Sequence, residues 1–162
     1  MSVQTTYNFS TTIGEAGGII DLAPYVIDSF TNENESGMAF GIGVITGAKP
    51  GKTVKVPDSG AVAGKFEGVV TNRRTTEYDL DGKVVIKKNA TVGVMRYGRI
   101  YVRVADSATP AYGDAVYMLK SGEQAGYFTN EASENVAIKG RFLGSMDATN
   151  HIAAVELFNV AN

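Results

Sequence analysis

The sequence predicts a mainly β protein: a single compact β-sandwich or β-barrel-like domain with an extended N-terminal arm and little helix. Apolar and polar residues alternate in short runs with a period of two, which is the period of a pleated strand. Turn residues such as Gly, Asp and Ser separate these runs at the close spacing typical of a sandwich or barrel. The apolar spacing of an amphipathic helix is nearly absent.

The clearest predicted strand covers 99–104, where Ile100, Val102 and Val104 share one face. A second strand is expected just before it, at 91–96. Tyr97-Gly98 then predicts a tight hairpin turn between the two, because glycine tolerates positive φ. The last run, 151–158, is apolar on both faces, which predicts a central or interface strand. Further strands are expected at 53–56, 65–70, 73–79, 83–88, 115–119, 126–129 and 138–142.

The domain organisation follows from a change in composition near residue 16. Residues 1–16 are polar and rich in Ser and Thr, with Tyr7, Phe9 and Ile13 as isolated apolar side chains. Such a segment cannot bury enough apolar surface to fold alone, but it can lie extended on another surface. We therefore expect an arm at 1–16 and one β-rich domain at 17–162, which suits a chain of 162 residues.

Reactive side chains are scarce. The chain has no Cys and one His, which excludes disulfides, thiol nucleophiles, Cys-based metal sites and multi-His metal sites. A Ser-His-Asp triad would depend on His151, and no Ser stands in a nucleophile-elbow motif. Gly41 and Gly43 lack the Lys-Ser/Thr of a phosphate loop and are interpreted as strand glycines. We expect no catalytic residue, no metal and no cofactor.

The N-terminus has neither a basic region nor an apolar core typical of a signal peptide. No apolar run approaches the roughly 18 residues of a membrane helix. Synthesis in a cytoplasm and no membrane partner are therefore expected.

The net charge of −2 conceals a strong segregation of charge along the chain. Residues 1–48 hold five acids and no Lys or Arg, 49–103 hold twelve bases and five acids, and 104–162 hold three bases and seven acids. An acidic chain without an aromatic-basic RNA-binding motif disfavours direct nucleic-acid binding. We interpret the basic middle as complementary to an acidic protein surface, including residues 1–48 of another copy.

Five blocks in a fixed order resemble the capsid decoration, or structural cement, proteins of tailed bacteriophages. The first has an apolar-Asp step, a Ser-containing strand, an acidic loop and Phe-Gly. The blocks are 16–47, 66–82, 92–104, 113–129 and 138–158. The resemblance implies a small β-rich body without catalytic residues that assembles into trimers or similar clusters. It also implies binding to the outside of the major capsid protein lattice, and an arm reaching a neighbouring subunit.

We therefore expect a homotrimeric decoration protein on the capsid exterior, made in the host bacterial cytoplasm, whose partners are the major capsid protein and itself. The candidate interface residues are Tyr7, Phe9 and Ile13 of the arm, Ile19, Ile20 and Leu22 after it, and Arg73 and Arg74 for acidic partner residues. One alternative is another β-rich virion component, a tail-tube or fibre module. A carbohydrate-binding module or small β-barrel enzyme is disfavoured because the chain has no Trp for sugar stacking and no convergent catalytic set.

Overall fold

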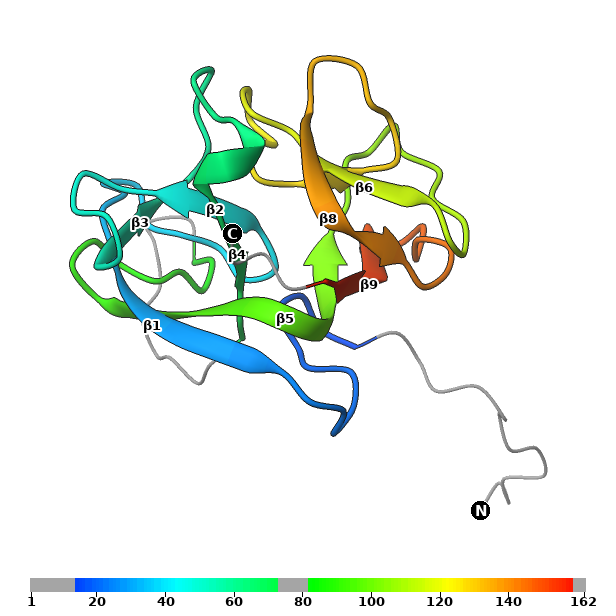
Figure 1. The fold of residues 1–162 in the computed structure, drawn as a ribbon, viewed down its shortest axis with the longest axis horizontal. Helices are drawn as coiled ribbons and strands as arrows, with labels where there is room; N and C mark the ends of the chain where they lie inside the picture. The colour runs from blue at the N-terminus through cyan, green and yellow to red at the C-terminus, as the bar shows by residue number, and fades with distance from the viewer. Residues whose placement is uncertain (1–13, 73–81, 159–162) are drawn as a thin grey trace.

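The computed structural model describes residues 14–72 and 82–158, and within them the predicted mainly β class is confirmed (Figure 1). The described strands are β1 (Val26–Asn32), β2 (Gly43–Thr46), β3 (Thr53–Lys55), β4 (Phe66–Val70), β5 (Thr91–Arg103), β6 (Ala115–Met118), β7 (Phe128–Thr129), β8 (Val136–Phe142) and β9 (Ile152–Leu157). One 3₁₀ turn, η1 (Ala63–Lys65), precedes β4. The short, turn-punctuated runs of the sequence thus become short strands.

Five strands form a closed barrel in the order β1-β3-β2-β4-β5, which β1 closes by pairing with β5. The β1–β3 pair is parallel and the other pairs are antiparallel. The barrel encloses one apolar core, formed by Phe30, Met38, Ile42, Val44, Val54, Val70, Ile86, Val92 and Val94. The barrel closes through a short contact, because β1 pairs with β3 only at Thr31 and Asn32.

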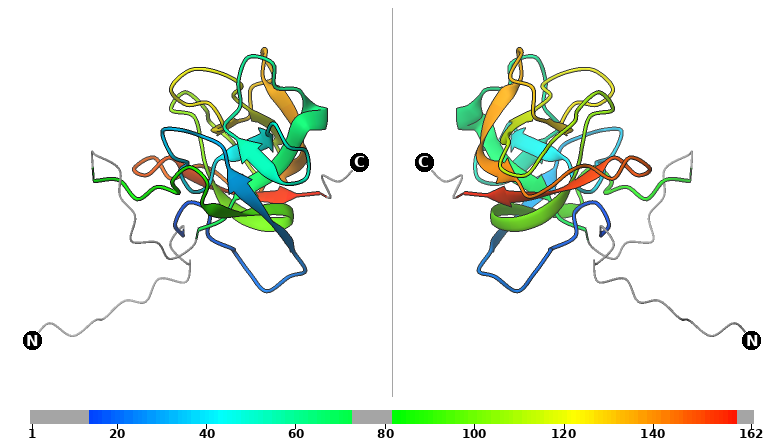
Figure 2. Two further views of the ribbon diagram at one scale, coloured as in Figure 1. Left: turned by 90° about the vertical axis from the view of Figure 1, so that its left-hand side faces the viewer. Right: turned by 90° about the vertical axis from the view of Figure 1, so that its right-hand side faces the viewer.

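The second half of β5 leaves the barrel and enters another sheet, in the order β5-β9-β8-β6-β7 (Figures 1 and 2). An isolated bridge between Val104 and Phe128 brings β7 back beside the end of β5. This sheet encloses a second core containing Phe128 and Phe142. The predicted central position of the last strand is confirmed, because β9 lies between β5 and β8.

The two cores share a wall of strands. Ile45, Val69 and Met95 of β2, β4 and β5 belong to the second core, whereas their neighbours Val44, Val70 and Val94 belong to the barrel core. Successive side chains of a strand point to opposite faces, so each of these strands is buried on both sides. The two sheets are therefore packed into one body.

The predicted hairpin at Tyr97-Gly98 is wrong, because β5 runs unbroken from Thr91 to Arg103. Gly98 has a φ of 123°, as a turn glycine would, but here that angle bends the strand where it leaves the barrel. A Cβ on Gly98 would lie 2.7 Å from the Cβ of Tyr25. Glycine is required at this position by both the backbone angle and the close approach of another chain segment.

The strands expected at 53–56, 65–70, 115–119, 126–129 and 138–142 coincide with β3, β4, β6, β7 and β8 to within a few residues. The run at 83–88 contains only an isolated bridge, between Ile86 and Met38. The expected strand at 73–79 lies outside the described residues. β1, which closes the barrel, was not expected from residue alternation, but it corresponds to the Ser-containing strand that the resemblance implies in block 16–47.

Candidate interaction surface

After a turn at Ala16 and Gly17, residues 18–20 run along the edge of β5. Gly17 N–H donates to the Tyr101 carbonyl at 2.7 Å, Tyr101 N–H donates to the Gly18 carbonyl at 3.0 Å, and Ile20 N–H donates to the Arg99 carbonyl at 3.2 Å. Ala16 is buried, so the end of the predicted arm already packs on the body. The segment that carries the first interface candidates is thus anchored to the strand that links the two sheets.

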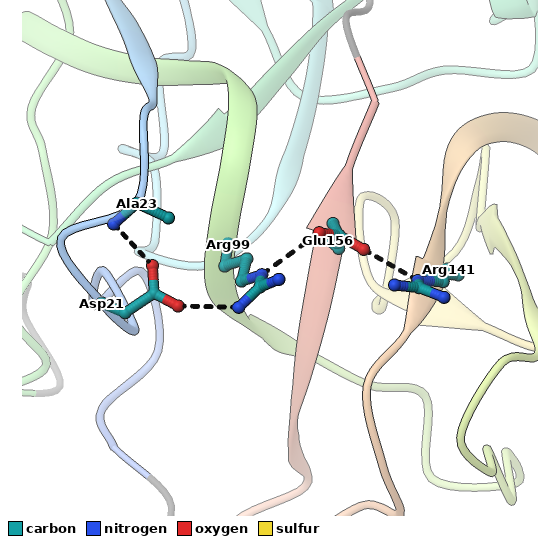
Figure 3. A network of polar contacts seen from close by, with 5 residues as sticks. All are labelled: Asp21, Ala23, Arg99, Arg141 and Glu156. Carbon is teal, nitrogen blue, oxygen red and sulfur yellow. Dashed lines mark hydrogen bonds and ion pairs between the residues drawn. The ribbon is translucent and has the colours of Figure 1, made fainter.

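The loop after this segment is held by the carboxylate of Asp21 (Figure 3). One oxygen accepts the N–H of Ala23 at 3.0 Å, a local turn that Asp side chains commonly make. The other accepts a hydrogen bond from Arg99 Nη1 at 3.0 Å. The loop projects from the body between β5 and β1 (Figure 2), with its backbone fixed at one end by the β5 pairing and at its tip by Asp21.

The Asp21–Arg99 pair continues as a row of charges across the sheet (Figure 3). Arg99 Nε donates to Glu156 at 3.1 Å, and Arg141 Nε donates to the other oxygen of Glu156 at 2.7 Å. The hydrogen bonds from Arg141 and Arg99 hold the pKa of Glu156 below its usual range, and those to Glu156 and Asp21 raise the pKa of Arg99. The row therefore joins the loop to β5, β9 and β8.

Exposed apolar side chains gather around this loop. Leu22 is 99% exposed, and Ile19, Tyr25 and Val26 are also exposed. Tyr97, exposed as well, is the register partner of Val26 on β5. We call these five residues the Leu22 patch. Contiguous exposed apolar surface that a fold holds in place is typical of a protein-interaction site.

The structure places the predicted interface residues unevenly. Ile19 and Leu22 belong to the Leu22 patch, whereas Ile20 is half-buried. Tyr7, Phe9, Ile13, Arg73 and Arg74 lie outside the described residues. Sequence reasoning missed Tyr25, Val26 and Tyr97, because the Ser-containing strand of block 16–47 was given no exact bounds and Tyr97 was interpreted as a turn residue. The sequence signal that could have pointed to these residues was a tyrosine next to Pro24 and another next to Gly98.

The segregated charges pair within the chain. Asp21 binds Arg99, Asp28 binds Arg96 at 3.1 Å, and Glu35 binds Lys88. Three of the five acids in residues 1–48 thus contact bases of the middle segment of the same molecule. These three acids therefore need no second copy to neutralise them, because the fold brings together charges that are far apart in the sequence.

A hollow of about 640 Å³ lies where the arm joins the body. Its lining residues are Gly14, Glu15, Ala16, Phe40, Asn72, Arg103, Asn150 and Ile152. Asn72 Nδ2 donates to Glu15 at 3.0 Å, and Arg103 Nε donates to the Phe40 carbonyl at 2.9 Å. The hollow is thus polar, with one acid and one base already engaged.

Groups suited to metal or catalytic chemistry are dispersed. Residues 14–72 and 82–158 contain no group of three or more His, Cys, Asp or Glu side chains placed to hold a metal ion. His151 lies just before β9, with its Nδ1 3.0 Å from Asp106 Oδ1. Within the same ranges, no helix is long and apolar enough to cross a membrane.

The described structure is a tightly packed β body with a projecting loop that exposes apolar side chains. The family model for "Structural cement protein (E217 gp24/Pam3 gp6)" matches residues 3–158, almost the whole chain. The chain belongs to this family of phage structural cement proteins. It is a virion-associated protein with a capsid decoration role, as the order of blocks in the sequence predicted.

A solved structure supports the fold. A chain of "The capsid of Myoviridae Phage XM1" is similar over 99% of this chain and 100% of its own length, with a TM-score of 0.74 and 19% sequence identity. No curated protein matches the sequence. The family places the capsid role ahead of the tail-tube, fibre and carbohydrate-binding alternatives.

Proposed function

We propose that the protein binds the outer surface of the major capsid protein lattice and stabilises the shell. The observation that carries this proposal is the Leu22 patch, which the Asp21–Arg99 pair and the pairing of residues 17–20 with β5 hold away from the body. A protein that binds the assembled shell more tightly than free capsid subunits stabilises the shell by mass action. Such a role needs surface complementarity rather than a reactive site.

Leu22 is the residue of this patch best suited to insert into a partner. Its side chain is almost fully exposed, so burial of that side chain would yield roughly 2 kcal/mol of apolar transfer free energy. The loop backbone is already fixed, which lowers the entropy lost on binding. An apolar pocket at a junction between capsid subunits is the complementary surface that we expect.

The arm and the basic pair supply the remaining proposed contacts. Tyr7, Phe9 and Ile13 are isolated apolar residues of a largely polar arm, and such anchors suit an extended segment that binds a neighbouring protein. Arg73 and Arg74 suit acidic partner residues, because guanidinium groups bind carboxylates in a bidentate manner. We further propose a homotrimer on the capsid exterior, made in the host bacterial cytoplasm.

Co-sedimentation with capsids that lack the protein tests the lattice contact. Leu22→Asp should abolish sedimentation with capsids and leave the unfolding transition unchanged, because the side chain makes almost no contact within the body. The matched control is Val62→Asp, an exposed apolar residue beside η1 that should bind as wild type does. Equal loss in both variants, or full binding of Leu22→Asp, would contradict the proposed contact.

Deletion of residues 2–13 tests the arm. The cut leaves Gly14 to Ala16 in place, because Ala16 is buried and Glu15 accepts a hydrogen bond from Asn72. We expect a folded body that no longer sediments with capsids. Sizing of the free protein separates a closed trimer from open-ended growth, which would instead favour a tail-tube module. Antibody labelling of intact virions tests the exterior position.

A further inference from the structure

Strand β1 has one unpaired edge. It pairs along its length with β5, but on its other side only Thr31 and Asn32 pair, with β3. Figure 1 shows β1 at the outside of the body. Asn32 N–H donates to Ala90 on the β5 side, and Thr31 N–H donates to Lys52 on the opposite side.

Successive residues of a strand direct their N–H and C=O groups to opposite sides. Ile27 and Ser29 therefore direct theirs away from β5, as Thr31 does. The register from Ile27 to Thr31 is uninterrupted, so this alternation holds throughout. No hydrogen bond joins these main-chain groups of Ile27 and Ser29 to another part of the chain that the structure describes. Four main-chain groups are thus available to a further strand.

In the described part of the chain, the edge from Ile27 to Thr31 carries no lysine and no register shift, although the register with β5 shifts just before it, between Val26 and Ile27. Natural edges carry lysines, bulges or covering loops. The single charged residue of β1 is Asp28, and Arg96 binds its carboxylate. Ser29 is exposed, and the apolar side chains of Tyr25 and Val26 border the start of the edge. This edge is therefore chemically suited to an uncharged, partly apolar strand.

The N-terminal arm has the sequence of such a strand. Between residues 2 and 13 the apolar and aromatic residues fall only at odd positions, threonines occupy the other two odd positions, and every even position is polar. The odd set is Val3, Thr5, Tyr7, Phe9, Thr11 and Ile13, and the even set is Ser2, Gln4, Thr6, Asn8, Ser10 and Thr12. The segment has no charged side chain, Gly or Pro. Apolar and aromatic side chains confined to every second position are typical of a strand with one buried face.

The point at which the arm leaves the body favours a second copy as its acceptor. A Cβ on Gly14 would lie 2.5 Å from the Tyr101 ring, so the arm begins beside Tyr101 of β5. The free edge of β1 flanks β5 near Met95, six residues away, which is roughly 20 Å along a strand. An arm returning to its own β1 would spend about half its length on this path and would have to pass the loop at 21–25.

We infer that the free edge of β1 binds the N-terminal arm of a second copy, which adds residues 2–13 as a strand beside Ile27 and Ser29. This inference rests on the proposed role of the arm and specifies its acceptor. The main chain supplies the affinity and the odd-numbered side chains supply the specificity, as in other cases of strand addition. The edge of each copy would then receive the arm of another.

Disulfide crosslinking tests the contact directly, because the native chain has no Cys. Two single-cysteine variants, Asn8→Cys and Ser29→Cys, are mixed and oxidised, one of them carrying a size tag. We expect a disulfide-linked heterodimer. Two controls replace Ser29→Cys with Ser133→Cys, exposed and far along the chain, or with Asn150→Cys at the rim of the hollow near the arm root.

A second series tests the strand itself. Tyr7→Asp and Phe9→Asp should each reduce the crosslinking yield at least tenfold, whereas Asn8→Asp and Ser10→Asp, one position away, should leave it within twofold. For this series the arm cysteine is placed at Gln4, which leaves all four positions available. Equal effects at odd and even positions would overturn the strand assignment.

The reaction is run both with free protein and on capsids that lack the protein. A heterodimer in either setting supports the inference. No heterodimer above the Ser133→Cys control in both settings overturns it, as does preferential crosslinking to Asn150→Cys. The double variant Asn8→Cys/Ser29→Cys also overturns it if it forms only an intramolecular disulfide. Loss of capsid sedimentation without arm crosslinking would leave the proposed function intact and reject this acceptor alone.

Discussion

Asp21 and Arg99, 78 positions apart in the sequence, form a 3.0 Å ion pair that fixes the loop carrying Leu22 to the strand shared by both sheets. The same arginine binds Glu156 of β9, so the loop is coupled to the second sheet as well. The position of the most exposed leucine in the described chain thus depends on charges within the body. This coupling makes the interaction surface a property of the whole fold.

Asp21→Ala should weaken capsid binding more than it weakens folding. The substitution removes the hydrogen bonds to Ala23 and Arg99, which frees the loop tip. Because the pair is partly exposed, we expect a loss of at most about 1 kcal/mol in the free energy of unfolding. Capsid affinity should fall about tenfold, since the loop must be reordered on binding. Denaturant unfolding and capsid sedimentation measure the two effects.

Glu35→Ala is the matched control, because it breaks another exposed ion pair, with Lys88, away from the Leu22 patch. It should leave capsid affinity within twofold of wild type. If Asp21→Ala and Glu35→Ala have equal effects on capsid affinity, general surface charge rather than the loop position governs binding.

Gly98→Ala should be strongly destabilising, by about 2–4 kcal/mol, because the methyl group meets Tyr25 and the backbone angle is strained. Gly113→Ala has a comparable φ of 90° but open space around the Cβ, so about 1 kcal/mol is expected. Gly144→Ala has open space and no positive φ, and should be close to neutral. Equilibrium unfolding in urea gives the order; equal losses at Gly98 and Gly113 would show that contact with Tyr25 contributes nothing.

Local patterns predicted most of the strands but not how the barrel closes. Ile100, Val102 and Val104 alternate with charged or aromatic residues; β5 contains the first two as expected, and Val104 follows its end and bridges to Phe128. Residue alternation did not indicate β1, because its apolar residues, Val26, Ile27 and Phe30, do not alternate regularly; only the resemblance implied a strand there. The burial of Phe30 depends on β5, which is more than sixty residues away in the sequence.

Gly98 and Arg99 show why the candidate site was only partly predictable. A glycine that bends a strand and a glycine that ends one need the same positive φ, so sequence alone favoured the commoner hairpin. The segregation of charge was visible in the sequence, but the partner of each charged segment was not. Pairing within the chain depends on the fold, which brings Asp21 beside Arg99. The exposed interface candidates near the arm, Ile19 and Leu22, could be predicted from local composition alone.

Salt should have little effect on the proposed trimer. The acids Asp21, Asp28 and Glu35 bind bases of their own chain, and residues 2–13 of the arm, which we propose to join copies, have no charged side chain. Between 0.1 and 1 M NaCl the Debye length falls from about 10 to 3 Å, which would disrupt an interface built on exposed charges. Light scattering across this range should give a constant mass, and dissociation at high salt would restore an interface between acidic and basic segments of different copies.

The row of charges around Glu156 should make folding sensitive to acid. Hydrogen bonds from Arg141 and Arg99 lower the pKa of Glu156 in the folded state below its ordinary value of 4.5. A lowered folded pKa gives stability that is present above the unfolded value and is lost as pH falls through the folded one. Glu156→Gln should therefore be less stable than wild type at pH 7, and the difference should shrink steadily below about pH 4.5. Urea unfolding between pH 3 and 7 measures this, with Glu123→Gln, exposed and without an ion pair to any described residue, as the control that should follow wild type at every pH. A constant difference between Glu156→Gln and wild type across that range would mean that packing, rather than the charge of Glu156, stabilises this part of the sheet.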